Sequence, residues 1–274
     1  MAEEHTMDTA EAGVFYDTIR RGGLPSAALA HGDAYIGQEC LLTPDEIADF
    51  ALRAGITAGT SVLDIGSGIG GPACYLAQRF ECQVLGVDIS TVGHDQALAR
   101  VRDTGLSHLV QFRCGDIQTL ALPAQAFDVV LSLDAWCHIP QRYLLLQRCA
   151  TWLRPGGRVA FYDHVERQPI PAPDRRRFCS LWRFPSLETP QSYVEALQAA
   201  GFRLLHHHET SIYARRFYSR LLAQYVARRA EFEAVRGPVR YQEGLERLDM
   251  SQRFAQAGIL GQFACIAEKP VARC

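Results

Sequence analysis

The fold is decided by the stretch Val62-Leu63-Asp64-Ile65-Gly66-Ser67-Gly68-Ile69-Gly70-Gly71. It joins an apolar run, typical of a buried strand, to a turn rich in glycine. Glycine takes up positive φ without steric cost, and a helix that follows such a turn begins with free backbone N–H groups. The stretch therefore predicts a strand, a ligand-binding turn and a helix in succession. Turns of this kind bind several classes of ligand, so the class must be decided by other residues.

Outward from this stretch, apolar runs alternate with helical patterns. The helical patterns lie near Gly71–Phe80, Val92–Thr104 and Gln141–Leu153. Strands this apolar, separated by helices, require a parallel sheet that is buried on both faces. We therefore expect a doubly wound α/β fold, with a mainly parallel seven-stranded sheet, helices on both faces and a helical cap. The expected strands are Ser61–Ile65, Val84–Val87, Leu109–Phe112, Phe127–Ser132, Arg158–Asp163, Phe202–His207 and Gly261–Glu268.

The chain is expected to form one compact domain in three parts. Residues 1–43 precede the sheet as an N-terminal cap or lid, and residues 44–165 form the core that binds the cofactor. Residues 166–274 complete the sheet and carry an inserted helical cap. Within that part, Tyr213–Ala257 is interpreted as two amphipathic helices split at Gly237-Pro238. We expect the caps over the carboxyl edge of the sheet, where open α/β folds bind ligands.

The composition excludes several classes of partner. The formal net charge is -2 and no sustained basic surface is visible, so nucleic acid is not expected. No apolar run is long enough to cross a bilayer, so no membrane is expected as a partner. The 9 cysteines are scattered and no apolar leader precedes them, which fits reduced thiols in a cytoplasm.

Two carboxylates distinguish between the possible cofactors. Asp88 ends the second strand about twenty residues after the glycine-rich turn, where an acid accepts hydrogen bonds from a ribose diol. NAD and adenosylmethionine both satisfy that spacing. Asp64, just before the glycines, would repel a pyrophosphate and attract the ammonium of a methionine moiety. The pattern therefore favours S-adenosylmethionine, held by Asp64, Gly66, Ser67, Gly68 and Asp88.

The ends of the third and fourth strands extend the same site. Asp116 can accept a hydrogen bond from the adenine amino group, while Ile117 and Ile89 enclose the ring. Leu133 and Asp134 follow the fourth strand and are expected at the mouth beside the methyl donor. An aspartate at a strand end is more often a helix N-cap than a ligand. Their order along successive strand ends nevertheless favours one cofactor site.

With these residues in place, the chain resembles the class I, Rossmann-like methyltransferases. Their signature comprises the glycine-rich loop, these strand-end acids and a turn such as Arg154-Pro155-Gly156-Gly157 before the fifth strand. The resemblance covers residues 44–165 and implies the cofactor but not the substrate. The chain is similar in particular to the phosphoethanolamine and sarcosine/dimethylglycine N-methyltransferases and to related natural-product methyltransferases. The residues Asp134-Ala135-Trp136-Cys137-His138 and the segment Gly32–Gly37 carry this narrower resemblance.

The narrower resemblance implies a methyl-transfer site built from His138, Tyr16 and Asp134. Because a sulfonium needs no activation, the enzyme has to align the acceptor and take up one proton. His138 is expected to be that base, since imidazole titrates near neutrality, and Tyr16 to hydrogen-bond to it. Asp134 would hold a cationic or hydroxyl-bearing acceptor. Capping by His138 and simple packing by Tyr16 are the alternatives.

The phosphate site of the phosphobase enzymes is matched less well. The resemblance implies lid tyrosines, an arginine and a late lysine around the phosphate, but here His164 follows the fifth-strand aspartate and the late helices contain no lysine. Arg175, Arg176 and Arg177 could supply charge. No metal is expected, because consecutive strand residues such as His206-His207-His208 point to alternating faces and cannot all reach one ion.

We therefore expect an enzyme, a methyltransferase that uses S-adenosylmethionine on a small-molecule acceptor, as a monomer or homodimer. N-methylation of an amine is the favoured expectation. Carbon or oxygen methylation of a specialised metabolite is the alternative. A different class also stays open, namely a cyclase or a binding protein that uses this fold without transferring a methyl group. An NAD-dependent oxidoreductase is the remaining rival, although Asp64 argues against it.

Overall fold

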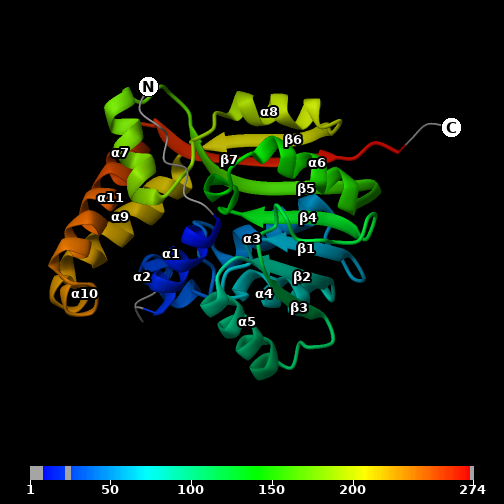
Figure 1. Cartoon of the computed structure of the whole chain (residues 1–274), viewed down its shortest axis with the longest axis horizontal. Helices are drawn as coiled ribbons and strands as arrows, with labels where there is room; N and C mark the ends of the chain where they lie inside the picture. Colours follow the sequence, from blue (N-terminus) through cyan, green and yellow to red (C-terminus); the bar gives the residue numbers. More distant parts are fainter. Residues whose placement is uncertain (1–8, 22–25, 272–274) are drawn as a thin grey trace.

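A seven-stranded sheet forms the centre of the structure, a computed structural model that describes residues 9–21 and 26–271 (Figure 1). The strands are β1 (Ser61–Ile65), β2 (Gln83–Asp88), β3 (Val110–Cys114), β4 (Phe127–Leu133), β5 (Leu153–Glu166), β6 (Arg203–Thr210) and β7 (Leu260–Glu268). They are arranged in the order β3-β2-β1-β4-β5-β7-β6. The first five run parallel, and β7 runs antiparallel between β5 and β6. The expected α/β fold is therefore confirmed.

The fifth strand begins earlier than its sequence indicates. The turn Arg154–Gly157 was expected to precede this strand, but β5 includes it and starts at Leu153. Leu153 pairs with Phe127 of β4, and pairing resumes at Arg158 after an irregularity in register. Gly156 N donates to Lys269 O, and Lys269 N donates to Gly157 O. These two backbone bonds make the glycine pair a bulged start of the strand instead of a separate turn.

Helices cover both faces of the sheet. α4 starts at the predicted residue, because Gly70 takes the left-handed φ of 77° and Pro72 fits the first turn of a helix. α3 starts with a capping box, in which Thr43 and Glu46 satisfy each other's backbone N–H groups. One face packs on α3 (Pro44–Ala54), α4 (Gly71–Phe80) and α5 (Thr91–Thr104), and the other on α6 (Arg142–Trp152) and α8 (Pro190–Ala199).

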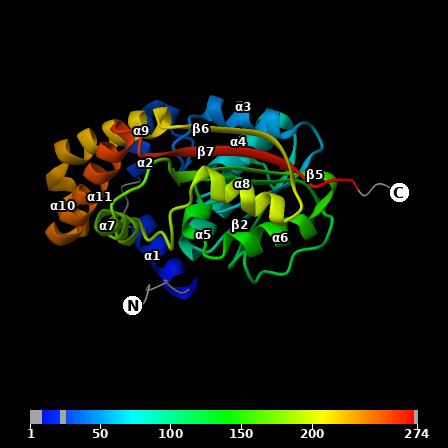
Figure 2. The same cartoon turned by 90° about the horizontal axis from the view of Figure 1, so that it is seen from above.

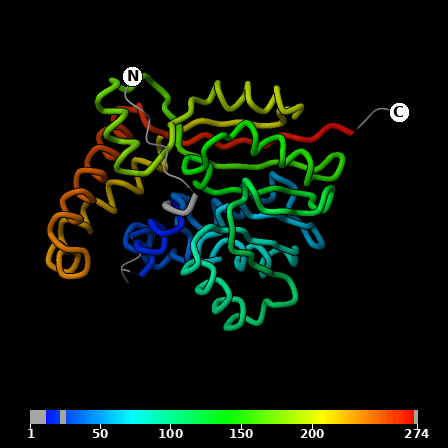
Figure 3. The backbone as a smooth tube through the Cα atoms, in the orientation of Figure 1, coloured from blue at the N-terminus to red at the C-terminus, as the bar shows by residue number. Residues whose placement is uncertain are grey.

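The remaining α-helices gather beyond the carboxyl ends of the parallel strands and form the cap (Figures 1 and 2). They are α1 (Thr9–Arg21), α2 (Ser26–His31), α7 (Ala172–Trp182), α9 (Ile212–Ala227), α10 (Arg229–Arg236) and α11 (Pro238–Gln256). α2 packs against α9, and α11 packs against α7 and α9, so segments from the two ends of the chain lie side by side (Figure 3). None of the helices described here is long and apolar enough to cross a membrane.

Two expectations about the cap need comment. The interpretation of Tyr213–Ala257 as two helices is wrong, because the chain breaks at Arg228 as well as at Gly237 and forms three. The break lets Phe232 pack back onto Tyr225, with ring centroids 4.1 Å apart. The residue at the break is Arg228, and no glycine or proline beside it indicates a break in the sequence. Parts of the expected N-terminal segment, residues 1–8 and 22–25, lie outside the described residues.

A buried arginine fixes the loop that follows β4. Arg142 donates from Nε to Trp136 O at 2.7 Å and from Nη2 to Cys137 O at 2.9 Å. Its Nη1 also lies 2.7 Å from Glu188 Oε1, and the Arg142 side chain is only 6% exposed. The loop is a short 3-10 helix, η2 (Trp136–His138), whose last residue lines the cavity described below. Arg142 therefore connects the sheet edge to the segment before α8.

We expect Arg142→Met to lower the free energy of unfolding by about 3–5 kcal/mol, because it leaves a carboxylate and buried carbonyl groups without their donor. Urea denaturation followed by circular dichroism measures this change. Arg154→Met is the control, since it removes an exposed ion pair with Asp128 and should cost about 1 kcal/mol or less. Equal losses in the two variants would contradict the role given to Arg142.

Candidate active site

A large cavity lies between the carboxyl edge of the sheet and the cap. Its volume is about 540 Å³. Parallel strands all end at this edge, so residues far apart in the sequence reach the same space. The cavity is lined by every residue predicted for the site. These are Tyr16, Asp64, Gly66, Ser67, Gly68, Asp88, Ile89, Asp116, Ile117, Leu133, Asp134 and His138.

The turn after β1 is shaped to bring its backbone close to a ligand. Gly66 and Gly68 have φ of 74° and 56°, a conformation that favours glycine. A Cβ atom on Gly68 would lie 2.7 Å from a carboxylate oxygen of Glu39. Ser67 Oγ is buried without a hydrogen-bond partner in the part of the chain described. Because buried polar atoms are normally paired, this hydroxyl fits a site completed by a polar cofactor.

Asp64 provides a carboxyl group at the base of the cavity. Its side chain is buried, and it forms no ion pair with any described residue. Burial first, and then the charge of Asp88, raises the pKa of Asp64 to about 7. A bound cation would stabilise the ionised form and reverse this shift. The geometry therefore fits the predicted contact with a methionine ammonium group.

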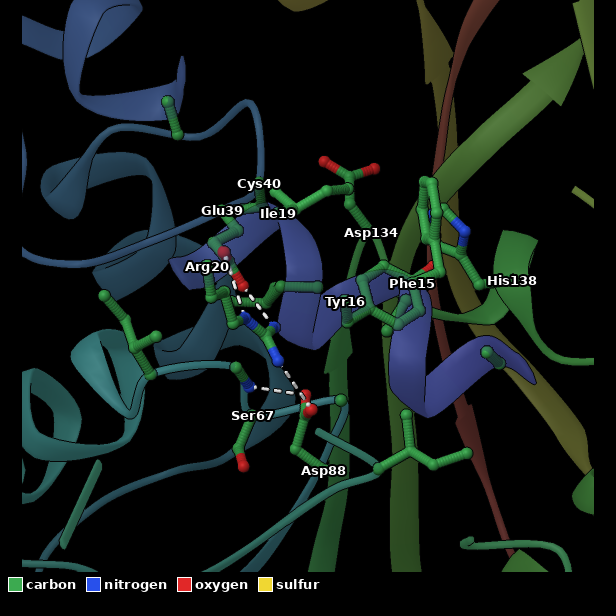
Figure 4. Close-up of a pocket in the computed structure, with 18 of the residues that line it drawn as sticks. Phe15, Tyr16, Ile19, Arg20, Glu39, Cys40, Ser67, Asp88, Asp134 and His138 are labelled. Atoms are coloured by element: carbon green, nitrogen blue, oxygen red, sulfur yellow. Dashed lines mark hydrogen bonds and ion pairs between the residues drawn. The ribbon is translucent and has the colours of Figure 1, made fainter. Parts of the chain in front are cut away.

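Asp88 accepts more hydrogen bonds from the protein than the sequence indicates. Its Oδ2 accepts from Gly68 N at 2.8 Å, and its Oδ1 accepts from Ser90 N at 2.9 Å. Arg20 Nη1 also donates to Oδ1, at 2.9 Å, while the same guanidinium pairs with Glu39 (Figure 4). A ribose diol can take both carboxylate oxygens of Asp88 only if Arg20 moves. No sequence motif pointed to Arg20 as a neighbour of Asp88.

The helix that carries Arg20 is held on the core at a second point. Asp17 accepts from the Ser90 and Thr91 hydroxyl groups, each at 2.6 Å, and from Val92 N at 3.1 Å. These groups belong to the start of α5, so Asp17 acts as an extra cap on that helix. Helix α1 is therefore fixed to both the end of β2 and the start of α5.

The third strand end contributes Asp116 with a partly structural role. Asp116 Oδ1 accepts from Gln118 N at 2.8 Å within a turn, so Asp116 does not cap a helix, which was the alternative interpretation. The residue also faces the cavity together with Ile117 and Ile89. The three residues predicted to enclose adenine therefore line the same cavity, Ile89 from the end of β2 and the other two from the end of β3, and their contact with adenine stays a prediction.

Asp134 is held by the protein itself. It follows β4 with the left-handed φ of 57°, and its side chain is 5% exposed. Oδ2 accepts from Leu41 N at 3.0 Å, and Oδ1 lies 3.0 Å from His164 Nδ1. The second contact is an ion pair and not a hydrogen bond, because its angle is too poor for one. The expectation that Asp134 holds the acceptor directly is therefore not supported by its contacts.

Tyr16 and His138 meet, but not as expected. Their rings lie edge to face with centroids 5.3 Å apart, and Tyr16 Oη and His138 Nδ1 are both buried without hydrogen-bond partners among the described residues. The predicted hydrogen bond is therefore wrong for this structure. Burial, followed by the charges of His164 and Arg142, lowers the pKa of His138 to about 3. A neutral imidazole so reluctant to accept a proton is a poor base.

His164 is a better candidate for holding a proton. Burial would lower the pKa of His164, but the carboxylates of Asp134 and Asp163 raise it above the usual value. His164 Nε2 lies 2.7 Å from Tyr218 Oη, so the imidazole joins Asp134 to a hydroxyl on the cap helix α9. All three side chains line the cavity. The sequence showed His164 only as a departure from the phosphobase pattern.

The arginines near the cavity also differ from those expected. Arg175 pairs with Glu166 and Arg177 with Glu246, and neither they nor Arg176 line the cavity. The expectation that these three supply charge to the site is therefore wrong. Arg236 and Arg247, on the late helices α10 and α11, line it instead. Their positions depend on how the cap folds, so local sequence patterns could not single them out.

Comparison with known proteins agrees with this fold. Residues 63–161 match the family described as methyltransferase domain. Phosphoethanolamine N-methyltransferase 1 of Arabidopsis thaliana is 34% identical over 190 residues, which are 69% of this chain and 38% of that protein. This chain spans less than two thirds of the length of the curated relatives it matches first.

Two solved structures share the fold over nearly the whole chain. Haemonchus contortus phosphoethanolamine N-methyltransferase 2, in complex with phosphomonomethylethanolamine and S-adenosylhomocysteine, superposes with a TM-score of 0.80 at 21% identity, covering 97% of this chain and 60% of that one. The [4+2]-cyclase SpnF gives 0.81 at 23% identity, covering 96% and 97%. At these identities the likeness shows the fold alone.

The strand order and the strand-end cavity define a Rossmann-like fold of the class I methyltransferase type. More specifically, residues 63–161 match a methyltransferase domain. The prediction of a methyltransferase domain is confirmed over these residues. The residue roles within the cavity are taken up as proposals below.

The affinity for S-adenosylhomocysteine is expected to rise between about pH 5.5 and about pH 7.5, because the raised pKa of Asp64 means that its carboxylate forms over this range. Only the ionised group attracts the ammonium. Isothermal titration calorimetry at several pH values measures the change. In the control Asp64→Asn the rise should disappear, and an unchanged rise would remove Asp64 from the ammonium site.

The pKa of His138 is expected to lie below that of free histidine, and the pKa of His164 above it. Nuclear magnetic resonance should show His138 neutral from about pH 5 to about pH 8, and His164 still protonated above about pH 6.5. His138→Asn and His164→Asn assign the two sets of signals. Asp134→Asn should lower the pKa of His164, and a normal titration of His138 would show that the burial argument fails.

Proposed function

We propose that this protein transfers a methyl group from S-adenosylmethionine to a small molecule with a large apolar body. One observation carries the proposal: the cavity that contains the strand-end carboxylates continues without a break into a pocket with aromatic walls. A methyl donor and an acceptor need such a shared space, because the reaction depends on aligning the two.

Within the cofactor half we assign the following roles. Asp64 binds the ammonium group, and Asp88 binds the ribose hydroxyl groups after Arg20 has moved away. Asp116 binds the adenine amino group, with Ile89 and Ile117 on the two faces of the ring. The backbone of the turn, together with Ser67 Oγ, contacts the methionine moiety. The remaining contacts come from Gly66, Gly68 and, at the mouth, Leu133.

The acceptor half favours carbon or oxygen methylation of a specialised metabolite over N-methylation of a small amine. Its walls are Trp182, Phe184, Phe217 and Leu221, which offer apolar faces. Asp134, the carboxylate expected to hold an amine, already pairs with Leu41 N and His164. A small cation would therefore leave apolar surface uncovered and find no open carboxylate.

S-adenosylmethionine supplies the methyl group on a sulfonium, so that the carbon–sulfur bond breaks with its electron pair remaining on sulfur. A bond forms from the acceptor to the methyl carbon, and the acceptor gives up a proton. We assign the His164–Asp134 pair to hold that proton, with Tyr218 Oη at Nε2 as the group nearest the acceptor pocket. Neutral His138 and Tyr16 shape the wall between the two halves.

The cap is proposed to enclose both ligands. Residues 1–43 contribute α1 and α2, and residues 166–274 contribute α7 and α9 to α11, while residues 44–165 hold the cofactor. Closure of such a cap excludes water and protects the transfer from side reactions.

The proposal is tested with S-adenosylhomocysteine first and with acceptors second. Asp88→Asn should weaken binding of S-adenosylhomocysteine by about 1–3 kcal/mol, because a hydroxyl group loses its ionised partner. Asp95→Asn, an exposed change on α5, should leave it unaltered. Phenols, polyketide and prenyl intermediates and small amines are then incubated with S-adenosylmethionine, and products that gain one methylene are sought by mass spectrometry.

Different outcomes separate the possible functions. A methylated phenol or carbon acid, formed in step with S-adenosylhomocysteine, supports the proposal. A methylated small amine as the best product would restore N-methylation. An isomerised product without S-adenosylhomocysteine would indicate a cyclase on this fold. Failure to bind either form of the cofactor at millimolar concentration would overturn the assignment.

A further inference from the structure

The far end of the cavity contains a cation without a carboxylate partner. Arg247 lies in the middle of α11 and lines the cavity. Its Nε is buried and has no hydrogen-bond partner, and none of the carboxylates in the described part of the chain forms an ion pair with it. Arginines on the outer surface nearby behave differently. Arg253 pairs with Asp249, and Arg177 pairs with Glu246.

The surroundings of Arg247 are aromatic and positively charged. Its guanidinium carbon lies 4.7 Å from the ring centroid of Trp182, which fixes the group against a flat apolar wall. Burial lowers the pKa of Arg247, Tyr225 raises it and the charge of Arg236 lowers it further. The carboxylate of Glu243 also raises the pKa, from beyond ion-pair distance. An anion placed here would relieve the repulsion between the two guanidinium groups.

The rest of the acceptor half is apolar. Phe184 stacks on Trp182 with ring centroids 5.9 Å apart, and Tyr218 meets Trp182 edge on. Leu221 and Leu248 complete this part of the wall. An acceptor that fits both Arg247 and this apolar wall needs apolar surface along its length and a negatively charged or oxygen-rich group at one end.

We propose that Arg247, supported by Arg236, binds an anionic group at one end of an apolar methyl acceptor. The anionic group is a carboxylate, phosphate or sulfate, and the apolar body lies along the wall that Trp182 and Tyr218 form together, with its nucleophilic atom toward His164. This inference rests on the proposed function, because it names the kind of acceptor for the same site. It places the specificity of the enzyme on α11, outside the part of the chain that matches the methyltransferase family.

The test uses two fluorescent probes that share one ring system. 8-Anilinonaphthalene-1-sulfonate carries an anionic group, and N-phenyl-1-naphthylamine has the same rings without it. Both are titrated into the full chain in the presence of S-adenosylhomocysteine. Arg247→Met should weaken binding of the sulfonate about tenfold or more and change binding of the neutral probe by less than about twofold. Arg253→Met, on the same helix, should change neither.

Each outcome decides the inference. Equal effects of Arg247→Met on the two probes, or no effect on either, would overturn the anion site. Phosphocholine has the charge without the rings. If it displaced the sulfonate at matching concentration, the apolar body would be wrong. Thermal melting confirms that the variants fold, and Arg247→Gln, which also removes the charge, replaces Arg247→Met if that variant does not fold.

The failure of this inference can be told apart from failure of the proposed function. Binding of S-adenosylhomocysteine is measured separately by calorimetry and should be the same in wild type, Arg247→Met and Arg253→Met. A protein that binds the cofactor but shows no dependence of the sulfonate probe on Arg247 keeps its methyltransferase assignment and loses only the anion site.

Discussion

The carboxylate of Asp134 joins the three parts of the protein that enclose the cavity. It accepts from the backbone of Leu41 before the core, contacts His164 on β5, and through that imidazole reaches Tyr218 on the cap. The residue also has a left-handed backbone, which a non-glycine residue adopts only when its neighbours hold it there. A buried carboxylate is costly unless it is paired, so Leu41 N and the His164 imidazole both stabilise Asp134 at the wall of the cavity.

Local chemistry explains why much of the fold was predictable. The helix Gly71–Phe80 was predicted with its correct bounds, because the glycines before it and Pro72 act within a few residues of the helix start. The cap was predicted to exist, but its break at Arg228 was not, since that break serves the packing of Phe232 on Tyr225 and has no sequence signal of its own. The bulged start of β5 likewise depends on backbone bonds to Lys269, more than a hundred positions away along the chain.

The same distinction applies to the site. The strand-end aspartates were recognisable because every parallel strand ends at one edge, so sequence order alone places them together. The partners that modify them were not recognisable. Arg20 reaches Asp88 across 68 positions, and His164 contacts Asp134. The pKa of His164 is raised, whereas that of His138 is lowered. Burial lowers the pKa of both histidines, and the carboxylates of Asp134 and Asp163 beside His164 decide which one is basic; these neighbours come together only in the folded chain.

The bridge from Arg20 to Glu39 and Asp88 links two events that are otherwise separate. The ribose of a bound cofactor and the guanidinium of Arg20 would compete for the carboxylate oxygens of Asp88. Docking of α1 should therefore weaken cofactor binding, and cofactor binding should weaken the docking of α1 to the same extent. The competing contact is electrostatic, so added salt weakens it more than it weakens a neutral hydroxyl contact. Ligand binding should therefore loosen the amino-terminal helix, and ionic strength should shift the balance between the docked helix and the bound ligand.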